Sequence, residues 1–403
     1  MREASPRNEG VFAGLRVIDA STLLAAPLIC GLLADFGAEV IKVEMPRVGD
    51  PVRHMTSQVG VEAAIHKVTN RNKYATTIDL HSERGRELFY QLVSKSDAVV
   101  TNFQRDTLRK WKIDYDDLKK RKADLVFLHL SAFGREGPWS ERPGFARVAE
   151  GFAGLMDRTG DPDGPPMPSG YPIVDAMAGL MGAYGVVTAL YRRRQTGEGE
   201  LVDLSLYDAL LRTMEDQVVE FALTGKIPKR SGTCNPSVAP NDLYRARDGQ
   251  YVIIPASTDT MFRRLCAAIG KPQLAEDPRF ATNATRVANR GVLDAELARQ
   301  FEQFSADDLM AVLLNAQVVV GRVNNVQDML EDPHCRQRGD FITVPDGDLG
   351  TIEMQGVVPR LLNAPGSVAW AGRDLGADNE YIFGKLCEIG KPELDRLAND
   401  GII

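Results

Sequence analysis

The 403-residue sequence has few of the residues that build metal centres or disulfide frameworks. It contains five cysteines and five histidines, and no two cysteines form a CxxC pair. His334 and Cys335 are the only neighbours of these two types, and adjacent residues rarely bind the same metal ion. We therefore expect no zinc site, and reduced thiols in a cytoplasmic compartment.

The sequence also lacks the short motifs that mark several enzyme classes. It has no GxGxxG after its first predicted strand, no P-loop, no GxSxG and no HExxH. Without the glycine fingerprint, a dinucleotide-dependent oxidoreductase is a distant alternative. The other absences argue against a Walker-type nucleotide site, an α/β-hydrolase nucleophile and a zincin.

Long hydrophobic runs and an excess of positive charge are missing too. The longest apolar run, 176–191, is too short to cross a bilayer and contains three glycines, so we expect a buried soluble helix. The first ten residues lack the apolar stretch of a secretory signal. With 48 Lys and Arg against 55 Asp and Glu, the net charge of −7 argues against a nucleic-acid binder. We predict a cytoplasmic protein with neither nucleic acid nor membrane among its partners.

Strand and helix patterns alternate along the first half, which is typical of βαβ units around a mainly parallel sheet. The predicted strands are 15–19, 40–44, 98–100, 125–128 and 201–206, and the predicted helices are 25–36, 82–95, 176–194 and 207–223. Prolines, serines and glycines crowd 226–241, so we predict a linker there. A hairpin and several helices follow from Asp242 and predict a smaller α+β domain.

Asp175, at the start of the predicted 176–194 helix, is the first candidate for chemistry. As a helix N-cap it would accept hydrogen bonds from unpaired backbone N–H groups. The same position would also keep the carboxylate ionised as a nucleophile. Gly179, Gly182 and Gly185 follow and form a strip without side chains, which either another backbone or a ligand can approach. The residues alone do not decide between a cap and a nucleophile for Asp175, or between helix packing and ligand binding for the glycine strip.

Two loops that follow predicted strands are further candidates, because open α/β sheets bind ligands at the carboxyl ends of their strands. One is 134–138, Gly-Arg-Glu-Gly-Pro, for which a plain turn is the alternative. The other is 101–105 with Arg109, Lys110 and Lys112, which predicts either a nucleotide site or a solvated helix face. We assign no role to the basic run 119–122.

Several motifs, in the right order, resemble the class III CoA-transferase family, which includes formyl-CoA and carnitine CoA-transferases and α-methylacyl-CoA racemases. The resemblance spans Gly14 to Ile403. Its motifs are Gly-Leu-Arg-Val-Ile-Asp at 14–19, Leu-Ala-Asp-Phe-Gly-Ala-Glu-Val-Ile-Lys-Val-Glu at 33–44, Asn-Arg-Asn-Lys at 70–73, Asp-Ala-Val-Val-Thr-Asn-Phe at 97–103, the 134–138 loop, Asp175, Thr-Gly-Glu-Gly at 196–199 and Asp-Leu-Ser-Leu-Tyr-Asp-Ala at 203–209. No single motif identifies the family, but the complete set in this order is highly specific for it.

The resemblance implies a fold and an assembly. A Rossmann-like large domain over 12–225 would be completed by a tail over 336–403, with a small domain over 242–335 between linkers. Two subunits would interlock like chain links, as a homodimer or with a paralogous subunit. The active site would then lie between the large domain of one subunit and the small domain of the other.

The resemblance also implies a chemistry. Asp175 would attack the thioester of an acyl-CoA, and CoA would pass through an anhydride, an aspartyl-CoA thioester and a second anhydride to an acceptor acid. The glycine strip and loop N–H groups would stabilise the oxyanion. Coenzyme A would be a substrate, with no tightly bound cofactor and no metal.

The family's CoA-binding residues can be matched to this sequence one by one. Ile78 and His81 would contact the adenosine region of CoA. Asn102 and Phe103 would contact CoA as well, and Lys110 would replace a usual arginine.

Four positions depart from the family pattern. Transferases often have glutamine at Leu24, arginine at Met45, an acidic residue at Ala146 and glutamine at Glu150. Leu24 would still be part of the CoA-binding site, and Arg47 would replace there the charge lost at Met45. The apolar Leu24 and Met45 favour a bulky or aromatic acceptor acid, with succinyl-CoA as the donor.

Two other functions share this fold. A racemase needs an acid/base pair beside the α-carbon, and the family's racemases place a His-Asp pair where this sequence has Gly144–Val148, without histidine. The departures from the pattern also suggest a non-catalytic subunit that completes the site of a paralogue, although Asp175 is retained. We predict a CoA-transferase, with these two as alternatives.

Overall fold

The computed structural model describes residues 10–55, 57–214 and 216–403, and their contacts divide them into two units. Unit 1 comprises the residues up to Leu155 together with Pro168–Thr224 and Arg336–Ile403, and unit 2 comprises Met156–Met167 and Gly225–Cys335. The first and last parts of the chain therefore share unit 1. Residues 156–167, which we placed in the large domain, make their contacts within unit 2. The predicted domain boundaries, with a linker over 226–241, stay predictions.

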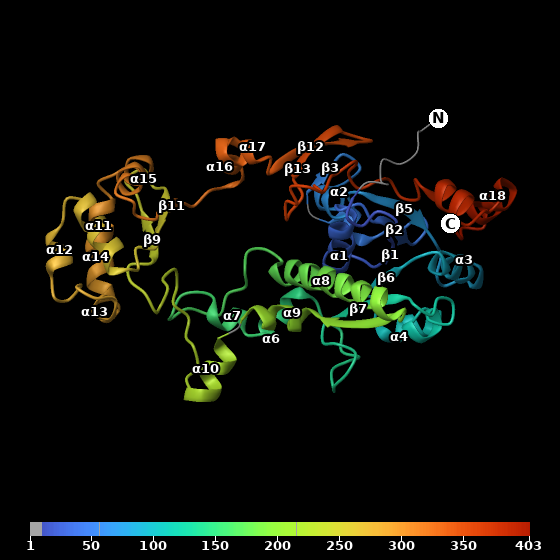
Figure 1. Cartoon of the computed structure of the whole chain (residues 1–403), viewed down its shortest axis with the longest axis horizontal. Helices are drawn as coiled ribbons and strands as arrows, with labels where there is room; N and C mark the ends of the chain where they lie inside the picture. Colours follow the sequence, from blue (N-terminus) through green and yellow to red (C-terminus); the bar gives the residue numbers. More distant parts are fainter. Residues whose placement is uncertain (1–9, 56, 215) are drawn as a thin grey trace. The chain divides into compact units, whose positions relative to one another are not determined.

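Unit 1 is built on a six-stranded sheet in which every neighbouring pair is parallel (Figure 1). The strand order is β5-β2-β1-β6-β7-β8, so the direction of winding reverses at β1, as in Rossmann-type sheets. The predicted α/β fold with a parallel sheet is confirmed. The strands are β1 (Arg16–Ala20), β2 (Glu39–Glu44), β5 (Lys73–Thr77), β6 (Ala98–Thr101), β7 (Val126–Ser131) and β8 (Glu200–Ser205).

Alternate strand residues face two separate hydrophobic cores, one on each side of the sheet. Val17 and Val100 belong to one core, and Ile18 and Val99 belong to the other. Strands that are buried on both faces have continuous apolar sequences, which is why these strands could be predicted.

Helices of unit 1 cover both faces. α3 begins as predicted, because the Ser82 hydroxyl accepts a hydrogen bond from the Gly85 N–H at 2.9 Å. The predicted helix 207–223 is instead two helices, α9 and α10. The helices are α1 (Ala25–Ala34), α2 (Ala64–Thr69), α3 (Glu83–Ser94), α4 (Arg105–Trp111), α5 (Tyr115–Leu118), α6 (Ala146–Phe152), α8 (Ile173–Thr196), α9 (Leu206–Thr213), α10 (Gln217–Thr224) and α18 (Lys391–Asn399), with short helical turns η1 (Pro51–His54) and η2 (Glu380–Leu386). Two short helices, α7 (Leu155–Arg158) and α17 (Pro333–Arg338), span the boundaries between the units.

The glycine strip of α8 is a packing surface. A Cβ atom on Gly179 would lie 2.5 Å from the Leu28 side chain, and one on Gly182 would lie 2.2 Å from Ile29. Both neighbours are on α1, so the missing side chains let the two helices approach closely. Gly179 and Gly182 therefore face α1, and Gly185 faces Val202 of the neighbouring strand, so the expectation that the strip stabilises an oxyanion is not supported.

α8 is longer than the predicted 176–194 helix. By length and composition alone, Ile173–Thr196 could cross a membrane, and a third of its most apolar window is buried. The same helix packs on α1, α9, β7 and β8, which are elements of the core of unit 1. This packing accounts for its apolar composition without a membrane.

The outer edge of the sheet is β5, and the C-terminal segment covers it. The Ala75 N–H donates to Asp378 Oδ2 at 2.8 Å, and the Thr77 N–H donates to Asn379 Oδ1 at 2.9 Å. Figure 1 shows this red segment beside the blue strands. An uncovered edge strand would present unpaired backbone groups, so the tail completes the sheet. Two hairpins also belong to unit 1, β3 (Gln58–Val59) with β4 (Glu62–Ala63) and β12 (Phe341–Asp346) with β13 (Gly350–Gln355).

Unit 2 has its own core and its own antiparallel sheet, β11-β10-β9. The predicted strand 318–323 is reduced to β11, which has two residues. The strands are β9 (Asp242–Arg245), β10 (Tyr251–Ile254) and β11 (Gly321–Arg322), and the helices are α11 (Asp259–Ala268), α12 (Gln273–Glu276), α13 (Asn283–Ala288), α14 (Arg290–Phe301), α15 (Ala306–Asn315) and α16 (Val326–Glu331).

Candidate active site

A cavity of about 420 Å³ opens in unit 1 at the carboxyl edge of the sheet, and we call it the Asp175 cavity. This volume lies within the range of pockets that hold small organic ligands. Its walls include the loop after β1 and the residues that follow β6 and β7. Its lining includes Thr22, Leu24, Asn102, Arg147, Glu150 and Asp175.

Asp175 is not the N-cap of α8. The helix begins at Ile173, with Pro172 as the N-cap residue. Asp175 is thus the third helical residue, and no side-chain cap bond is formed. Among the described residues, its carboxylate has no hydrogen bond or ion pair. The structure therefore leaves the oxygens of this carboxylate available to a ligand.

Burial raises the pKa of Asp175 from 3.8 to about 6. The positive end of the α8 dipole acts in the opposite direction, because it stabilises the anion. At neutral pH the carboxylate is mostly ionised, but it is poorly solvated and has no partner. Carboxylates in such surroundings are common at catalytic sites.

This raised pKa predicts a measurable effect on stability. Because the folded protein disfavours the Asp175 anion, stability is lost as the pH rises through about 6. Asp175→Asn removes the anion, so its unfolding free energy relative to wild type should rise by about 2 kcal/mol between pH 4 and pH 8. Urea titrations at both pH values would measure this difference. A difference that does not change with pH would contradict the raised pKa.

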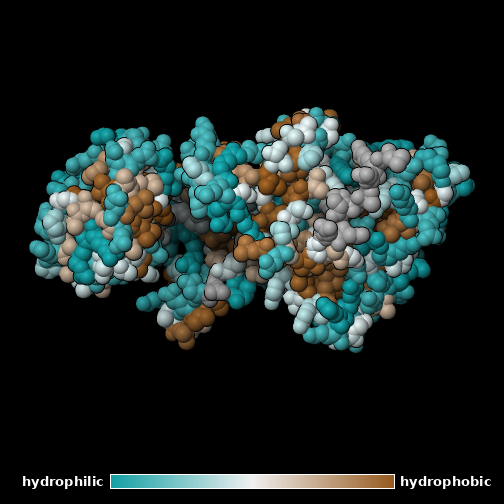
Figure 2. Space-filling model, turned by 45° about the horizontal axis from the view of Figure 1, so that its top comes forward, coloured by the Kyte–Doolittle hydropathy of each residue, from teal (hydrophilic) through white to brown (hydrophobic). Residues whose placement is uncertain are grey.

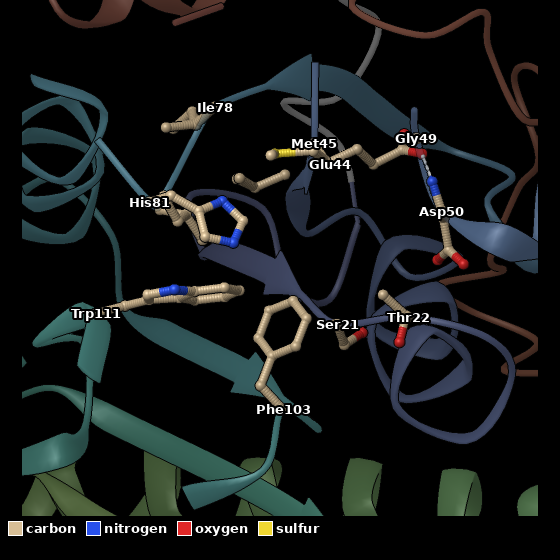
Figure 3. Close-up of a pocket in the computed structure, with 12 residues that line it drawn as sticks. Ser21, Thr22, Glu44, Met45, Gly49, Asp50, Ile78, His81, Phe103 and Trp111 are labelled. Carbon is tan, nitrogen blue, oxygen red and sulfur yellow. Dashed lines mark hydrogen bonds between the residues drawn. The ribbon is translucent and has the colours of Figure 1, made fainter. Parts of the chain in front are cut away.

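Three aromatic rings enclose a second cavity, which we call the aromatic pocket (Figure 3). The ring centroids of His81 and Trp111 are 4.8 Å apart, and those of Phe103 and Trp111 are 5.1 Å apart. Ile78 and Met45 add apolar walls on the opposite side. Aromatic faces above an apolar floor are suited to a purine base.

Shared residues connect the two cavities. Thr22 lines both of them. A third, smaller cavity shares Phe103 with the aromatic pocket and Asn102 with the Asp175 cavity. Because Thr22 follows β1 and Asn102 follows β6, the connection lies where the strand order reverses, the usual ligand site of such sheets.

Side-chain contacts fix the loop 21–24, whose residues line both cavities. The Asn102 amide accepts from the Thr22 N–H at 2.9 Å and donates to the Thr22 carbonyl at 2.8 Å. The Leu23 N–H donates to Asp50 Oδ1 at 3.0 Å. Leu23 itself has a φ of +69°, a left-handed conformation that is strained for leucine. The loop keeps this conformation because its neighbours hold its backbone.

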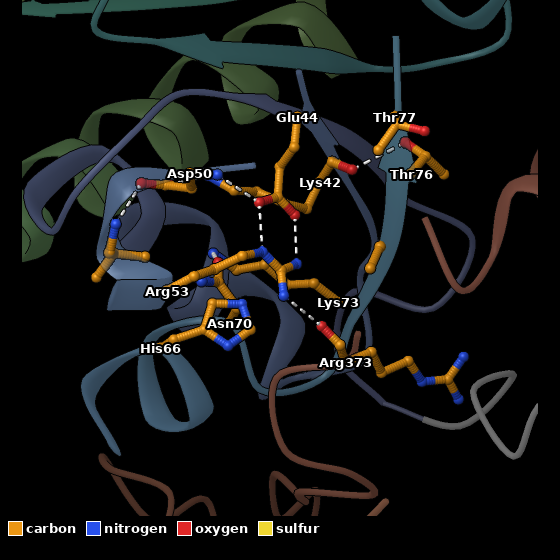
Figure 4. Close-up of polar contacts among 12 residues, drawn as sticks. Lys42, Glu44, Asp50, Arg53, His66, Asn70, Lys73, Thr76, Thr77 and Arg373 are labelled. Carbon is orange, nitrogen blue, oxygen red and sulfur yellow. Dashed lines mark hydrogen bonds and ion pairs between the residues drawn. The ribbon is translucent and has the colours of Figure 1, made fainter. Parts of the chain in front are cut away.

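A buried network of charges contacts this loop, and Figure 4 shows its members. Lys42 Nζ donates to the Ser21 carbonyl at 2.5 Å and to Asp50 Oδ2 at 2.8 Å. Arg53 pairs with both oxygens of Glu44, at 2.8 and 2.6 Å, and Glu44 accepts from the Asp50 N–H at 2.8 Å. The network positions the loop, and its charges are paired with one another, although Glu44 and Asp50 also line the aromatic pocket.

The residues predicted to bind CoA are distributed unevenly. Ile78, His81 and Phe103 line the aromatic pocket, and Leu24 and Asn102 line the Asp175 cavity. Two further residues line neither of them. Lys110 is on the exposed face of α4, and Arg47 is exposed beside the C-terminal end of the chain.

The sequence interpretation missed two residues of these cavities. Trp111 directly follows Lys110, at the end of α4. Phe103 lies before α4 and Trp111 lies at its end, so the two residues do not share one helix and their spacing follows no helical period. Arg147 lies within the loop that we examined for a racemase histidine, but its own charge was not considered. No group of three or more metal-ligating side chains occurs in the described part of the chain.

Comparisons with known proteins identify the family. The family model for CoA-transferase family III matches residues 12–379. The chain is 39% identical to the succinyl-CoA–D-citramalate CoA-transferase of Chloroflexus aurantiacus, over 96% of this chain and 97% of that protein. It is 34% identical to the alpha subunit of the succinyl-CoA–L-malate CoA-transferase of the same organism, over 97% of this chain and 92% of that one.

A solved structure gives the same result. A CAIB/BAIF family protein from Brucella suis superposes with a TM-score of 0.86 at 34% identity, and covers 94% of this chain and 100% of that one. The parallel sheet, the whole-chain sequence match and the motifs described above agree. The chain belongs to CoA-transferase family III.

Proposed function

We propose that this CoA-transferase moves CoA from succinyl-CoA to a small dicarboxylic acid, with Asp175 as the nucleophile. The unpartnered carboxylate of Asp175, in a cavity joined to the aromatic pocket, carries the proposal. The names of the two relatives support the substrates, because succinyl-CoA is the donor of both and D-citramalate and L-malate are dicarboxylates. We therefore propose a small dicarboxylic acid as the acceptor, in place of the bulky or aromatic acid that the sequence analysis favoured from Leu24 and Met45.

The reaction requires no net proton transfer. A carboxylate oxygen of Asp175 attacks the thioester carbonyl, the C–S bond breaks, and CoA thiolate and a mixed anhydride form. The thiolate then attacks the Asp175 carbonyl carbon and releases the donor acid as its carboxylate. The acceptor carboxylate displaces CoA from the resulting aspartyl-CoA thioester, and the thiolate finally attacks the acceptor acyl carbon and frees Asp175.

The aromatic pocket is proposed to hold the adenine of CoA, with Ile78, His81 and Phe103 against the base. Leu24 would contact the acyl group. The Asn102 amide is occupied by the Thr22 backbone, so Asn102 would act by positioning that loop. Lys110 and Arg47 would supply charge to the phosphates from the surface. These charges are local, because the chain as a whole carries −7.

Removing the Trp111 ring should weaken binding of the nucleotide. We expect Trp111→Ala to raise KM for succinyl-CoA about tenfold and to change kcat little, because stacking on an aromatic ring contributes about 1–3 kcal/mol per base. Trp111→Phe keeps an aromatic face and should stay within about threefold of wild type. Succinyl-pantetheine, which lacks adenine, should show no difference between wild type and Trp111→Ala. An equal change with both donors would contradict an adenine pocket.

The assembly is part of the proposal. Large apolar side chains are exposed on α8 and α10, among them Tyr184, Tyr191 and Phe221. Figure 2 shows apolar residues gathered in patches on the face that it presents. An interlocked dimer would cover such surface. One relative is named as an alpha subunit, so a paralogous partner is the alternative to a homodimer.

We propose a cytoplasmic location.

A panel of acids tests the proposal. Purified protein is incubated with succinyl-CoA and L-malate, D-citramalate, benzoate or acetate, and new CoA esters are measured by mass spectrometry. Transfer to the diacids supports the proposal, and transfer to benzoate alone would overturn its acceptor class. Deuterium exchange at the α-carbon of a 2-methylacyl-CoA without an acceptor would favour the racemase alternative. Activity that appears only with a co-expressed relative, and with that relative's own aspartate, would favour the non-catalytic subunit.

A further inference from the structure

The charges that line the Asp175 cavity are few and unequal. Two carboxylates, Glu150 and Asp175, face one cationic side chain, Arg147. All other residues that line this cavity, which lies wholly within the described part of unit 1, are apolar or neutral. A monocarboxylic acid could occupy this cavity with its one carboxylate at Asp175. A dicarboxylic acid brings a second negative charge, and within this subunit Arg147 is the one lining side chain whose positive charge can offset it.

Arg147 has donors available for such a charge. It is the second residue of α6, and its side chain is 57% exposed. Its Nη1 donates to the Ser169 carbonyl at 3.1 Å, the one hydrogen bond it makes among the described residues. A guanidinium has five N–H donors and can bind a carboxylate with two of them in parallel. The remaining donors can therefore bind a ligand without breaking that bond.

Glu150 holds this arrangement in place. Its side chain is buried, and Oε1 accepts from the Ser169 N–H at 2.6 Å. Its Oε2 lies 3.6 Å from Arg147 Nη1, one turn along α6. The contact with Glu150 and the bond to Ser169 keep the Arg147 guanidinium at the cavity wall. Glu150 is occupied by its contacts with Ser169 and Arg147. Arg147 is therefore the side chain that can bind a negatively charged group of a ligand.

Building on the proposed function, we propose that Arg147 is the specificity residue for dicarboxylates, and that it binds the carboxylate remote from the reacting carbonyl. The same residue would serve both halves of the reaction. A succinyl group on CoA and a diacid acceptor each react at one end with Asp175 and each carry a free carboxylate at the other. Since donor and acceptor occupy the cavity in turn, one cation is sufficient for both.

The test compares acids that differ in this charge. Wild type, Arg147→Gln and Arg147→Lys are assayed with two pairs of similar size, succinyl-CoA with L-malate and butyryl-CoA with 3-hydroxybutyrate. We expect Arg147→Gln to lower kcat/KM for the first pair about 10- to 100-fold, as the loss of a charge-assisted bond implies, and for the second less than about threefold. Arg147→Lys should restore part of the loss.

A control separates this effect from a general loss of charge. Arg192→Gln removes an exposed guanidinium of α8 that pairs with Glu198 at 2.6 Å, and it should leave both substrate pairs unchanged. Thermal unfolding of Arg147→Gln is measured beside wild type, because loss of the contact with Glu150 at 3.6 Å should lower stability but should not change the ratio between the two pairs. If Arg147→Gln lowers both pairs equally, or neither, the inference is overturned although the proposed function stands. If wild type transfers CoA in no pair, the proposed function itself fails.

Discussion

Replacing Asp175 with asparagine should lower the rate of CoA transfer at least about a thousandfold, the scale on which removal of a catalytic nucleophile acts. The amide has nearly the same size as the carboxylate but does not form the anhydride. The carboxylate has no partner among the described residues, so its replacement breaks no contact. Turnover is measured with succinyl-CoA and L-malate. Intact-protein mass spectra should show a CoA adduct in wild type after exposure to succinyl-CoA, and none in Asp175→Asn.

Asp208→Asn is the matched control for this prediction. Asp208 also lies in the first turn of a helix, α9, but it is exposed and does not line the Asp175 cavity. Transfer by Asp208→Asn should equal that of wild type. Full activity in Asp175→Asn would sink the proposed mechanism.

Lys42→Met should destabilise the protein by about 3–5 kcal/mol, the cost of removing one partner from a buried ion pair. The Lys42 side chain is 1% exposed, and its Nζ lies 2.8 Å from Asp50 and 3.7 Å from Asp19. Burial alone would lower the pKa of Lys42, but the nearby carboxylates raise it overall, so the lysine is charged at neutral pH. Without it, Asp19 retains Lys73 at 2.7 Å, whereas Asp50 loses its cation. Urea unfolding measures the loss.

Two companion variants make this result interpretable. Lys120→Met removes a lysine whose side chain is 72% exposed and should change the unfolding free energy by less than about 0.5 kcal/mol. Adding Asp50→Asn to Lys42→Met removes the orphaned charge and should recover part of the stability. A loss below about 1 kcal/mol in Lys42→Met would show that the network contributes little.

The predictable parts of the fold are those determined by apolar sequence. β1, β2, β6 and β7 are buried on both faces, so their runs of valine, isoleucine and leucine are visible without a structure. β5 was missed because Lys73, Thr76 and Thr77 look like surface residues. All three are buried, and Lys73 is accommodated by Asp19 and by the carbonyl of Pro27 at 2.7 Å. Such partners come from distant segments and leave no local pattern.

For the candidate site, the sequence predicted several single residues but not how they are brought together. Asp175 emerged from its position at a helix start and from the family resemblance, but it does not cap α8, which begins two residues earlier at Ile173. His81 and Phe103 were named singly, but nothing in the sequence indicated that Trp111 would bring them together. The role of Arg147 depends on which residues share its cavity, and that is known only from the fold.

The covered edge of β5 also has a consequence for synthesis. Thr77 bonds to Asn379, which is 302 residues later in the chain. At about 5–20 residues per second, the ribosome needs about 15–60 s to make the intervening segment. Until then a nascent chain that has assembled its first strands carries an open strand edge. This interval, and not the stability of the finished protein, is when mispairing with a neighbouring polypeptide or capture by a chaperone is most favoured.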